Sequence, residues 1–303
     1  MRLLTIRHTT RYRYRQPVRF GPHRFMFRPR DSHDIRVVSS GLTITPAHEL
    51  RWFHDVFGNS VALATFSEMA EELVVDSTIV VEHYGINDST FPVDPTARIL
   101  PVSYSSQEYP DLARAIERHF PDPEKRIDAW ARRFLLERDQ TEIMPLLETM
   151  TRTIKEEFTY IPRETEGVQT PLDTLDSQTG TCRDYALFMM EAARSLGLAA
   201  RFVSGYLYDP ALEGFDSGMV GAGATHAWVQ VYLPGPGWIE CDPTNGIIGG
   251  NNLIRVGVAR DPEQAMPMSG TYYGARDDFL EMTAEVTVSS NAGAAPSVSA
   301  AMR

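Results

Sequence analysis

Hydrophobic and polar residues alternate through most of the first hundred residues. In RLLTIRHTTRYRYR, near the N-terminus, Leu4, Ile6 and His8 alternate with polar or charged neighbours. A two-residue period is typical of a β-strand with one buried face. Three further runs have strand character: DIRVVSSGLTITP, LRWFHDVFGNSVALATF and EELVVDSTIVVEHY. The second contains FGNSV, a turn signal typical of a hairpin. This spacing predicts an all-β domain over residues 1–100, a sandwich or a compact barrel.

A polar segment with four prolines, residues 91–110, interrupts this pattern and predicts a linker. Beyond it apolar residues recur every three or four positions, which predicts helices. The helical segments are DLARAIERHF, PEKRIDAWARRFLLER and TEIMPLLETMTRTIKEEFTY. Further along, the strand AARFVSGYLYDP and a glycine-bearing loop at 209–225 precede another strand. We interpret residues 101–283 as an α+β domain. Residues 284–303 end in a small, polar, unpatterned sequence and are predicted to be disordered.

The stretch GTCRDYALFMMEAARSLGL, residues 180–198, predicts a helix that begins near Cys182. Thr181 is in the N-cap position and Asp184 lies three residues later, as in a capping box. Apolar residues then recur at helical spacing, and Gly197 follows where a left-handed residue commonly ends a helix. Unpaired N–H groups and the helix dipole favour an anion at the helix start. A thiol there ionises more easily, and the thiolate is the reactive form. The alternative is that Cys182 is a small, half-buried residue without chemistry.

Composition and charge narrow the classes of function. Apolar residues make up 43% of the chain and charged residues 23%, so sizeable hydrophobic cores are expected. The formal net charge of −11 argues against binding to nucleic acid or to anionic membranes. No stretch approaches the ~20 apolar residues of a membrane span, and MRLLTIRHTT has too short an apolar run for a signal peptide. We therefore expect a cytoplasmic protein in which Cys182 and Cys241 are reduced thiols.

The segment HAWVQVYLPGPGWIECD predicts two antiparallel strands joined by a turn at PGPG. If the loop has an odd number of residues, so that Tyr232 lies opposite Trp238, the strand register is set. His226 and Asp242 are then diagonal neighbours on one face of the sheet. Cys241 points to the opposite face, because side chains alternate along a strand. The register therefore predicts a contact between His226 and Asp242, with Cys241 packed elsewhere.

These features together predict a catalytic triad of Cys182, His226 and Asp242. The Cys182 thiolate would attack an acyl carbon, His226 would transfer protons, and Asp242 would orient the imidazole and favour its charged form. Backbone N–H groups at the helix start would stabilise the oxyanion, with Tyr160 and Gln178 as candidate side-chain donors. Taken singly, His226 has the alternative of a satisfied strand histidine. Asp242 has that of an acceptor of backbone bonds in the turn DPTNG.

Two long segments closely resemble the core of bacterial transglutaminase-like proteins, a papain-related superfamily of thiol enzymes. They are TPLDTLDSQTGTCRDYALFMMEAARSLGLAARFVSGY and THAWVQVYLPGPGWIECDPTNG. The G-x-C-R-D helix start, the H-A-W strand and the G-W-x-x-x-D-P-T hairpin stand in family order within residues 155–250. IRHTTRYRYRQPV and HRFMFRPR are similar to the β domain that precedes this core in many bacterial members. The resemblance implies a cysteine helix packed on an antiparallel sheet, with Cys182 as nucleophile, His226 as base and Asp242 as third member.

Four other residues lie in or beside these motifs. Trp228 and Trp238 match the family pattern, and we expect them to be core or groove-wall residues. Asp184 also matches, with capping as its expected role. Cys241, immediately before the third triad member, is a local departure and should pack.

The superfamily contains proteases, amidases and cross-linking transglutaminases, which share an acyl-enzyme and differ in the acceptor. We expect first a cysteine peptidase or amidohydrolase that acts on a peptide or amide substrate and needs no cofactor. The second expectation is a protein-glutamine transglutaminase, in which an amine is the acceptor. The sequence contains no D-x-[DN]-x-[DN]-G calcium loop, which argues against cross-linking of the extracellular kind.

Two hypotheses come from other classes of protein. In one, the β domain binds a partner and the thiol fold is vestigial. In the other, Cys182, His226, Cys241 and Asp242 hold a metal ion. That arrangement lacks a Cys-x-x-Cys spacing and needs adjacent residues from opposite strand faces to converge on one ion.

Overall fold

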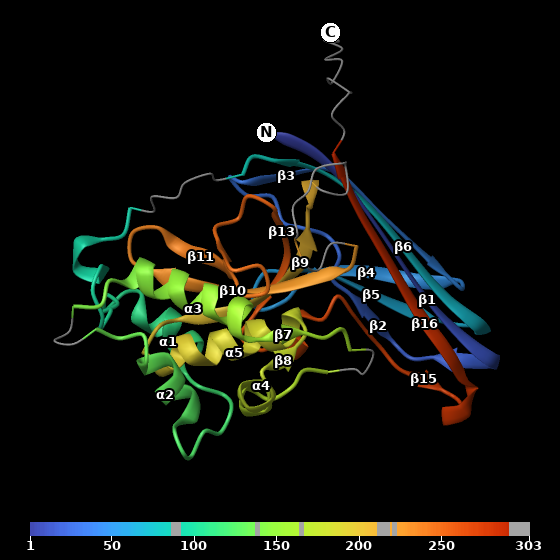
Figure 1. Cartoon of the computed structure of the whole chain (residues 1–303). Helices are drawn as coiled ribbons and strands as arrows, with labels where there is room; N and C mark the ends of the chain where they lie inside the picture. The colour runs from blue at the N-terminus through green and yellow to red at the C-terminus, as the bar shows by residue number, and fades with distance from the viewer. Residues whose placement is uncertain (86–91, 137–139, 164–166, 211–218, 220–222, 291–303) are drawn as a thin grey trace, which may run out of the picture.

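The computed structural model describes the chain except for residues 86–91, 137–139, 164–166, 211–218, 220–222 and 291–303. The architecture is α+β, as the sequence predicts. Two sheets built mainly from N-terminal strands form a β-sandwich, and a third sheet packs with the helices. In Figure 1 the sandwich lies on the right, the helices lie at the lower left, and the third sheet lies between them.

The larger sheet of the sandwich has the strand order β15-β1-β6-β3, with β16 also paired to β1. Its members are β1 (Arg2–Phe20), β3 (Ile35–Thr45), β6 (Met69–His83), β15 (Tyr272–Tyr273) and β16 (Phe279–Ser290). The smaller sheet has the order β14-β2-β5-β4. Its members are β2 (His23–Phe25), β4 (His48–His54), β5 (Ser60–Phe66) and β14 (Met268–Ser269). The predicted hairpin is confirmed, because β4 and β5 pair on either side of the FGNSV turn.

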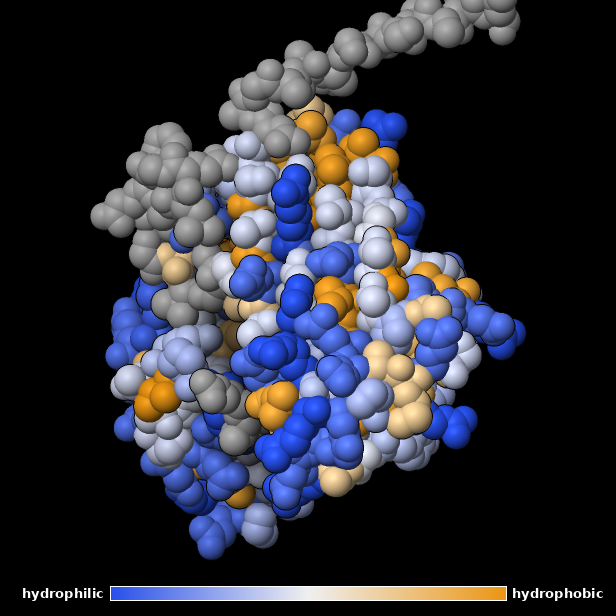
Figure 2. All heavy atoms as spheres, turned by 90° about the vertical axis from the view of Figure 1, so that its right-hand side faces the viewer, coloured by the Kyte–Doolittle hydropathy of each residue, from blue (hydrophilic) through white to orange (hydrophobic). Residues whose placement is uncertain are grey.

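The alternation along β1 places its apolar residues inside the sandwich. Leu4, Ile6 and His8 are buried, whereas Arg7 is exposed. Figure 2 shows the side of the sandwich that faces away from the helices, where hydrophilic residues separate small hydrophobic groups. Ion pairs across the strands, such as Arg11–Glu72 at 2.9 Å, lie in solvent and contribute little to stability.

The third sheet has the strand order β12-β11-β10-β9-β13. Its strands are β9 (Ala200–Leu207), β10 (Thr225–Leu233), β11 (Gly237–Asp242), β12 (Ile247–Ile248) and β13 (Leu253–Ala259). The helices are α1 (Tyr109–Ile116), α2 (Arg126–Arg132), α3 (Ile143–Glu157), α4 (Pro171–Ser177) and α5 (Cys182–Ser195). A short parallel pair, β7 (Thr159–Tyr160) and β8 (Thr179–Gly180), lies beside the start of α5.

Helix α5 is the central element of the core. It contacts strands β9 and β10 as well as helices α2, α3 and α4. Nearly all of its residues are buried, including charged Glu191 and Arg194, which pair with each other at 2.9 Å. The face of the third sheet opposite α5 packs against the sandwich through a cluster that includes Trp228 and Phe57. The helix start is therefore held by packing from several directions.

The segment after the sandwich departs from the predicted linker. Val93, Ala97 and Leu100 are buried in the same core as α5, and Ile99 forms a β-bridge with Glu142. This segment is anchored to the helical core because its apolar residues find partners there. Part of the predicted linker, residue 91, lies outside the described residues.

The predicted C-terminal boundary is wrong for residues 284–290. They belong to β16, which pairs antiparallel with β1 from Leu4 to Tyr14. Val286 and Val288 are buried in the sandwich core, so their alternation with polar residues marks a strand. Strands β14, β15 and β16 all join N-terminal sheets, so residues 268–283 pack away from the helical core to which we assigned them. The remainder of the predicted tail, residues 291–303, lies outside the described residues.

In the described part of the chain, no helix has the length and apolar character needed to cross a bilayer.

Candidate active site

The start of α5 is built as the sequence predicts. The Asp184 carboxylate accepts hydrogen bonds from the Thr181 backbone N–H at 2.8 Å and from its hydroxyl at 2.9 Å. Cys182 is the first residue of the helix and is 6% exposed. Gly180 is required beside it, because a Cβ there would lie 2.9 Å from the Asp184 Cβ. Gly197, with φ of +82°, follows the helix end. The capping prediction is confirmed.

Asp184 also fixes the loop that precedes α4. Its second oxygen, Oδ1, accepts from the Arg163 guanidinium at 3.0 Å and from the Gln169 backbone N–H at 2.7 Å. The side chain is fully buried, so these donors replace water around its charge. Sequence reasoning assigned only the cap to Asp184. The bonds to Arg163 and Gln169 are long-range and left no local signal.

The β10–β11 hairpin has the predicted register. Tyr232 lies opposite Trp238, and the pairing continues to Val229 opposite Cys241. The His226 Nε2 lies 2.8 Å from the Asp242 Oδ2, with both side chains buried. The ionised carboxylate can only accept, so Nε2 carries the proton. The predicted contact between His226 and Asp242 is confirmed.

Asp242 is also held by the turn that follows it. Its Oδ1 accepts from the backbone N–H groups of Thr244 at 3.0 Å and Asn245 at 3.3 Å. The Asn245 side-chain amide donates to Oδ2 at 2.7 Å. Burial would raise the pKa of Asp242, but the His226 charge and these hydrogen bonds lower it. Asp242 is therefore both a turn residue and the partner of His226. Asn245 was missed, although an amide three residues after an aspartate in DPTNG is a recognisable turn signal.

The remaining ring nitrogen of His226 is left for the thiol. Burial alone would lower the pKa of His226. The Asp242 carboxylate and then the Cys182 sulfur, through charge and hydrogen bonding, raise that pKa to about 10. Nδ1 has no hydrogen-bond partner of normal geometry among the described residues. We therefore interpret Cys182 as a neighbour of the imidazole that acts on this pKa through charge and through a contact outside standard hydrogen-bond geometry. The structure brings the three predicted side chains together.

Tyr160 lies against the thiol. The pairing of Tyr160 with Gly180 in the β7–β8 ladder places it beside the helix start. Burial, followed by the charge of Cys182 and a hydrogen bond with its side chain, raises the pKa of Tyr160 to about 12. The Cys182 backbone N–H also interacts with the phenol. Gln178, the other candidate donor, ends α4 in the left-handed conformation and is exposed. Of the two candidates, Tyr160 is the one that the structure places at Cys182.

The remaining predicted residues have structural surroundings. Cys241 is fully buried, its pKa is raised by that burial, and it forms no disulfide with Cys182. Trp228 is fully buried and stacks near His226, with ring centroids 5.9 Å apart. Trp238 is half-buried and meets the Tyr232 ring edge to face, with ring centroids 5.3 Å apart. These positions agree with packing roles.

Two predictions remain, the metal site and the loop 209–225. Within the described ranges, no group of three or more His, Cys, Asp and Glu side chains is placed to hold a metal ion. The metal hypothesis at Cys182, His226, Cys241 and Asp242 thus gains no support from the geometry. Most of the glycine-bearing loop 209–225 lies outside the described residues.

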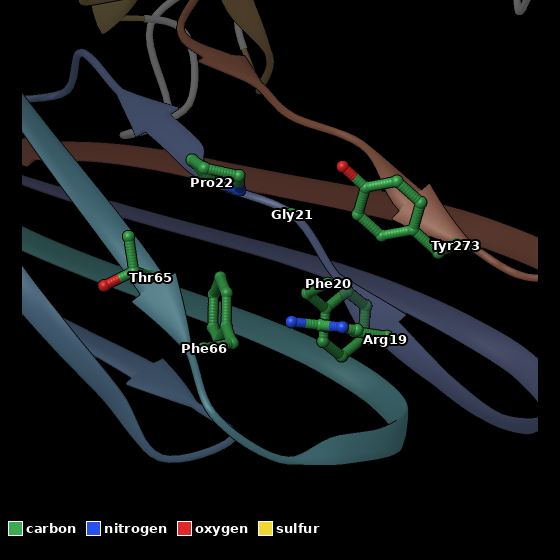
Figure 3. Close-up of a pocket in the computed structure, with 7 residues that line it drawn as sticks. All are labelled: Arg19, Phe20, Gly21, Pro22, Thr65, Phe66 and Tyr273. Atoms are coloured by element: carbon green, nitrogen blue, oxygen red, sulfur yellow. The ribbon is translucent and has the colours of Figure 1, made fainter.

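Two sizeable cavities are separate from the triad. One, of about 540 Å³, lies on the sandwich between Phe20, Phe66 and Tyr273, as Figure 3 shows. The other, of about 580 Å³, lies between the sandwich and the third sheet. Neither is lined by Cys182, His226 or Asp242. The size of a cavity therefore does not indicate where the triad lies.

Comparison with known proteins defines the class. The family model for the bacterial transglutaminase-like N-terminal region matches residues 4–82, and that for the transglutaminase-like superfamily matches residues 129–243. The chain belongs to the transglutaminase-like superfamily, as its motifs indicate. This membership supports a thiol-dependent enzyme at the level of the family.

Individual relatives span different parts of the chain. The uncharacterized protein Rv2569c of Mycobacterium tuberculosis is 30% identical over 300 residues, covering 93% of this chain and 91% of that protein. A protein-glutamine gamma-glutamyltransferase of Pseudomonas aeruginosa is 35% identical over 69 residues, which is 23% of this chain and 10% of the relative. The crystal structure of a "putative cysteine protease" from Cytophaga hutchinsonii has a TM-score of 0.67 at 19% identity, covering 97% of this chain and 92% of that one. At this identity the likeness concerns the fold.

Proposed function

We propose that the protein is a cysteine peptidase or amidohydrolase that forms an acyl-enzyme on Cys182. The Cys182 sulfur attacks the carbonyl carbon of a peptide or amide. The tetrahedral intermediate then expels the amine, which takes its proton from His226. Water, deprotonated by His226, attacks the thioester and releases the acid and the free thiol. The reaction needs only these side chains and water, so no cofactor is proposed.

The single observation that carries this proposal is the buried His226–Asp242 pair, 2.8 Å apart, with the second imidazole nitrogen left for Cys182. The carboxylate holds the imidazole in one tautomer and favours the imidazolium. An imidazolium beside the sulfur favours the thiolate, as does the N-terminal position of Cys182 on α5. Backbone N–H groups at the helix start and the Tyr160 hydroxyl are the proposed oxyanion donors.

An amine acceptor is the second candidate function. It is favoured by the local similarity to a protein-glutamine gamma-glutamyltransferase, which covers 23% of the chain. Both functions share the thioester and differ only in the group that attacks it. The two are separated by measuring ammonia release and amine incorporation on one glutamine-containing peptide. Ammonia release without incorporation supports hydrolysis, and stoichiometric incorporation supports transfer.

The substrate and the location are part of the same proposal. We propose a peptide or an amide-containing molecule as the substrate and neither nucleic acid nor membrane as a partner, since the net charge is −11. A cytoplasmic location fits the two free thiols.

The proposal is tested by trapping the acyl-enzyme. The wild-type protein, Cys182→Ala and Cys241→Ala are incubated with a library of acyl-reactive peptide and ester probes, and adducts are located by mass spectrometry. We expect one adduct on Cys182 in the wild type and in Cys241→Ala, and none in Cys182→Ala. Labelling that persists in Cys182→Ala, or that maps to Cys241, would contradict the assignment.

A further inference from the structure

A second site is suggested by the cavity of about 580 Å³ between the sandwich and the third sheet. One wall is the segment around Arg30 and Asp34, after β2. The other wall consists of side chains on the third sheet: Arg201 on β9, Trp238 and Glu240 on β11, and Arg255 on β13. A cavity of this size, at a junction between structural units, is typical of a small-molecule site. Its chemistry is set by these charged groups.

Two of the three carboxylates that line the cavity, Asp34 and Glu240, are paired with Arg255, and the third, Asp31, accepts from the Val37 backbone N–H at 2.8 Å. Arg255 pairs with Glu240 at 2.6 Å and with Asp34 at 3.4 Å. Glu240 also accepts hydrogen bonds from the Gln230 amide, at 2.7 Å, and from the Trp228 indole N–H. Both Glu240 oxygens are thus engaged, and Arg255 is neutralised.

Arg201 has no such direct ion pair. Its Nε donates to the Gln230 side-chain oxygen at 2.7 Å, and its guanidinium carbon lies 3.9 Å from the centre of the Trp238 ring. No carboxylate oxygen lies within 4.0 Å of its nitrogens among the described residues. Burial lowers the pKa of Arg201 to about 10, Glu240 opposes that effect, and the charges of Arg255 and Arg30 add to it. Arg201 is half-buried and forms no direct ion pair, and a bound anion would recover part of the free energy that its partial desolvation costs.

We infer that this cavity binds a small monoanionic carboxylate through the Arg201 guanidinium. The planar fork of an arginine matches the two oxygens of a carboxylate. Trp238 holds the guanidinium plane, and Gln230 occupies Nε, so the two terminal nitrogens remain for the ligand. The fixed carboxylates of Asp34 and Glu240 repel a phosphate dianion more strongly than a single negative charge. The apolar wall, with Val258 and Phe57, suits the rest of a ligand of amino-acid or short-peptide size.

The carboxylate could belong to a free acid or to the C-terminus of a peptide. This inference does not rest on the proposed catalytic function, since no triad member lines the cavity. Cys182→Ala is therefore expected to bind the same ligand as the wild type. Its failure to catalyse would leave the binding measurement intact.

Binding is measured by saturation-transfer NMR and calorimetry with N-acetylglycine, a carboxylate with one amide. N-acetylglycinamide is the uncharged control, inorganic phosphate is the dianion, and tri-alanine tests the peptide C-terminus. We expect saturable binding of N-acetylglycine that weakens at least about tenfold in Arg201→Gln. Arg114→Gln, which removes an exposed arginine of α1 outside the cavity, should bind as the wild type does. Tighter binding of tri-alanine identifies a peptide terminus, and tighter binding of N-acetylglycine identifies a free acid.

A second measurement uses only the wild-type protein, so its result does not depend on whether Arg201→Gln folds. Phenylglyoxal modifies accessible arginines, and peptide mapping gives the rate at each position. N-acetylglycine should slow modification of Arg201 and leave that of Arg114 unchanged. The inference is overturned by an unchanged rate at Arg201, by equal binding of N-acetylglycinamide, or by phosphate binding tighter than carboxylate.

Discussion

At the scale of single residues, His226 lies between the other two members of the proposed triad. Its imidazole touches Asp242 through one nitrogen and faces Cys182 with the other. The sequence predicted this pair because strand alternation and an odd-length turn leave one register in which the two side chains meet. The role of Tyr160 beside Cys182 had only weak support in the sequence. The β7–β8 pairing that places it joins residues twenty positions apart, Thr159 with Thr179 and Tyr160 with Gly180.

The raised pKa of His226 predicts a pH-dependent contribution to stability. The folded state binds the imidazole proton more tightly than the unfolded state, whose pKa is near 6.5. The contribution is therefore fully present below pH 6.5 and is lost as the pH rises toward 10. We expect the difference in unfolding free energy between the wild type and His226→Gln to shrink between pH 6.5 and pH 10. Urea unfolding at three pH values checks this, and a constant difference would contradict it.

Tyr160 is predicted to assist acylation of Cys182. Tyr160→Phe removes the hydroxyl that lies against the thiol and its backbone N–H. We expect acylation of Cys182 by p-nitrophenyl acetate to slow by about a hundredfold to a thousandfold. Tyr185→Phe is the matched control, because the Tyr185 hydroxyl has no partner of normal geometry in the described part of the chain. Equal rates in the two variants would remove Tyr160 from the oxyanion site.

At the scale of elements, the Cys182 sulfur at the start of α5 is positioned both by a short local motif and by packing against residues distant in the sequence. Its start and end could be predicted, because Thr181, Asp184 and Gly197 act through local backbone geometry. The packing of α4 beside it and the bonds from Arg163 depend on residues whose spacing carries no helical or strand period. The short elements α4 and β13 were for this reason not predicted.

Asp184 is predicted to be the main support of the helix start. Asp184→Ala would leave the Arg163 charge and three further donors, two on Thr181 and one on Gln169, without their acceptor. Removing one partner of a buried charged network typically costs about 3–5 kcal/mol. Asp173→Ala at the exposed start of α4, where Thr170 makes the similar cap, should cost about 1 kcal/mol or less. The free energies of unfolding in urea decide between these values, and equal losses would contradict the account.

At the scale of the whole molecule, the chain returns at its end to the sheet in which it began. Antiparallel pairing of β16 with β1 closes this loop across more than two hundred residues, as Leu4 lies opposite Ser290. No local pattern predicts such a contact, and the small residues near the end of the chain favoured disorder instead. The division into a β-sandwich and an α+β core could be predicted, because each part has its own hydrophobic period.

The return strand is predicted to stabilise the sandwich. Val286→Ala combined with Val288→Ala removes two buried side chains from its core and should lower the free energy of unfolding by about 2–5 kcal/mol. Thr283→Ala combined with Thr287→Ala changes two exposed positions of the same strand and should have little effect. Denaturant unfolding of the two double variants gives the comparison. Equal stabilities would mean that β16 contributes little to the sandwich.

The proposed enzyme depends most on the reactivity of Cys182, and the rate at which iodoacetamide alkylates this thiol at pH 7 measures that reactivity directly. In the wild type we expect Cys182 to react at least about tenfold faster than a free model thiol, whose pKa is about 8.5. His226→Gln should bring that rate down to the level of the model thiol, and Cys241 should stay unmodified in the folded protein. A Cys182 that reacts no faster than the model thiol, in the wild type as in His226→Gln, would contradict the enzyme and support a binding protein with a vestigial thiol fold.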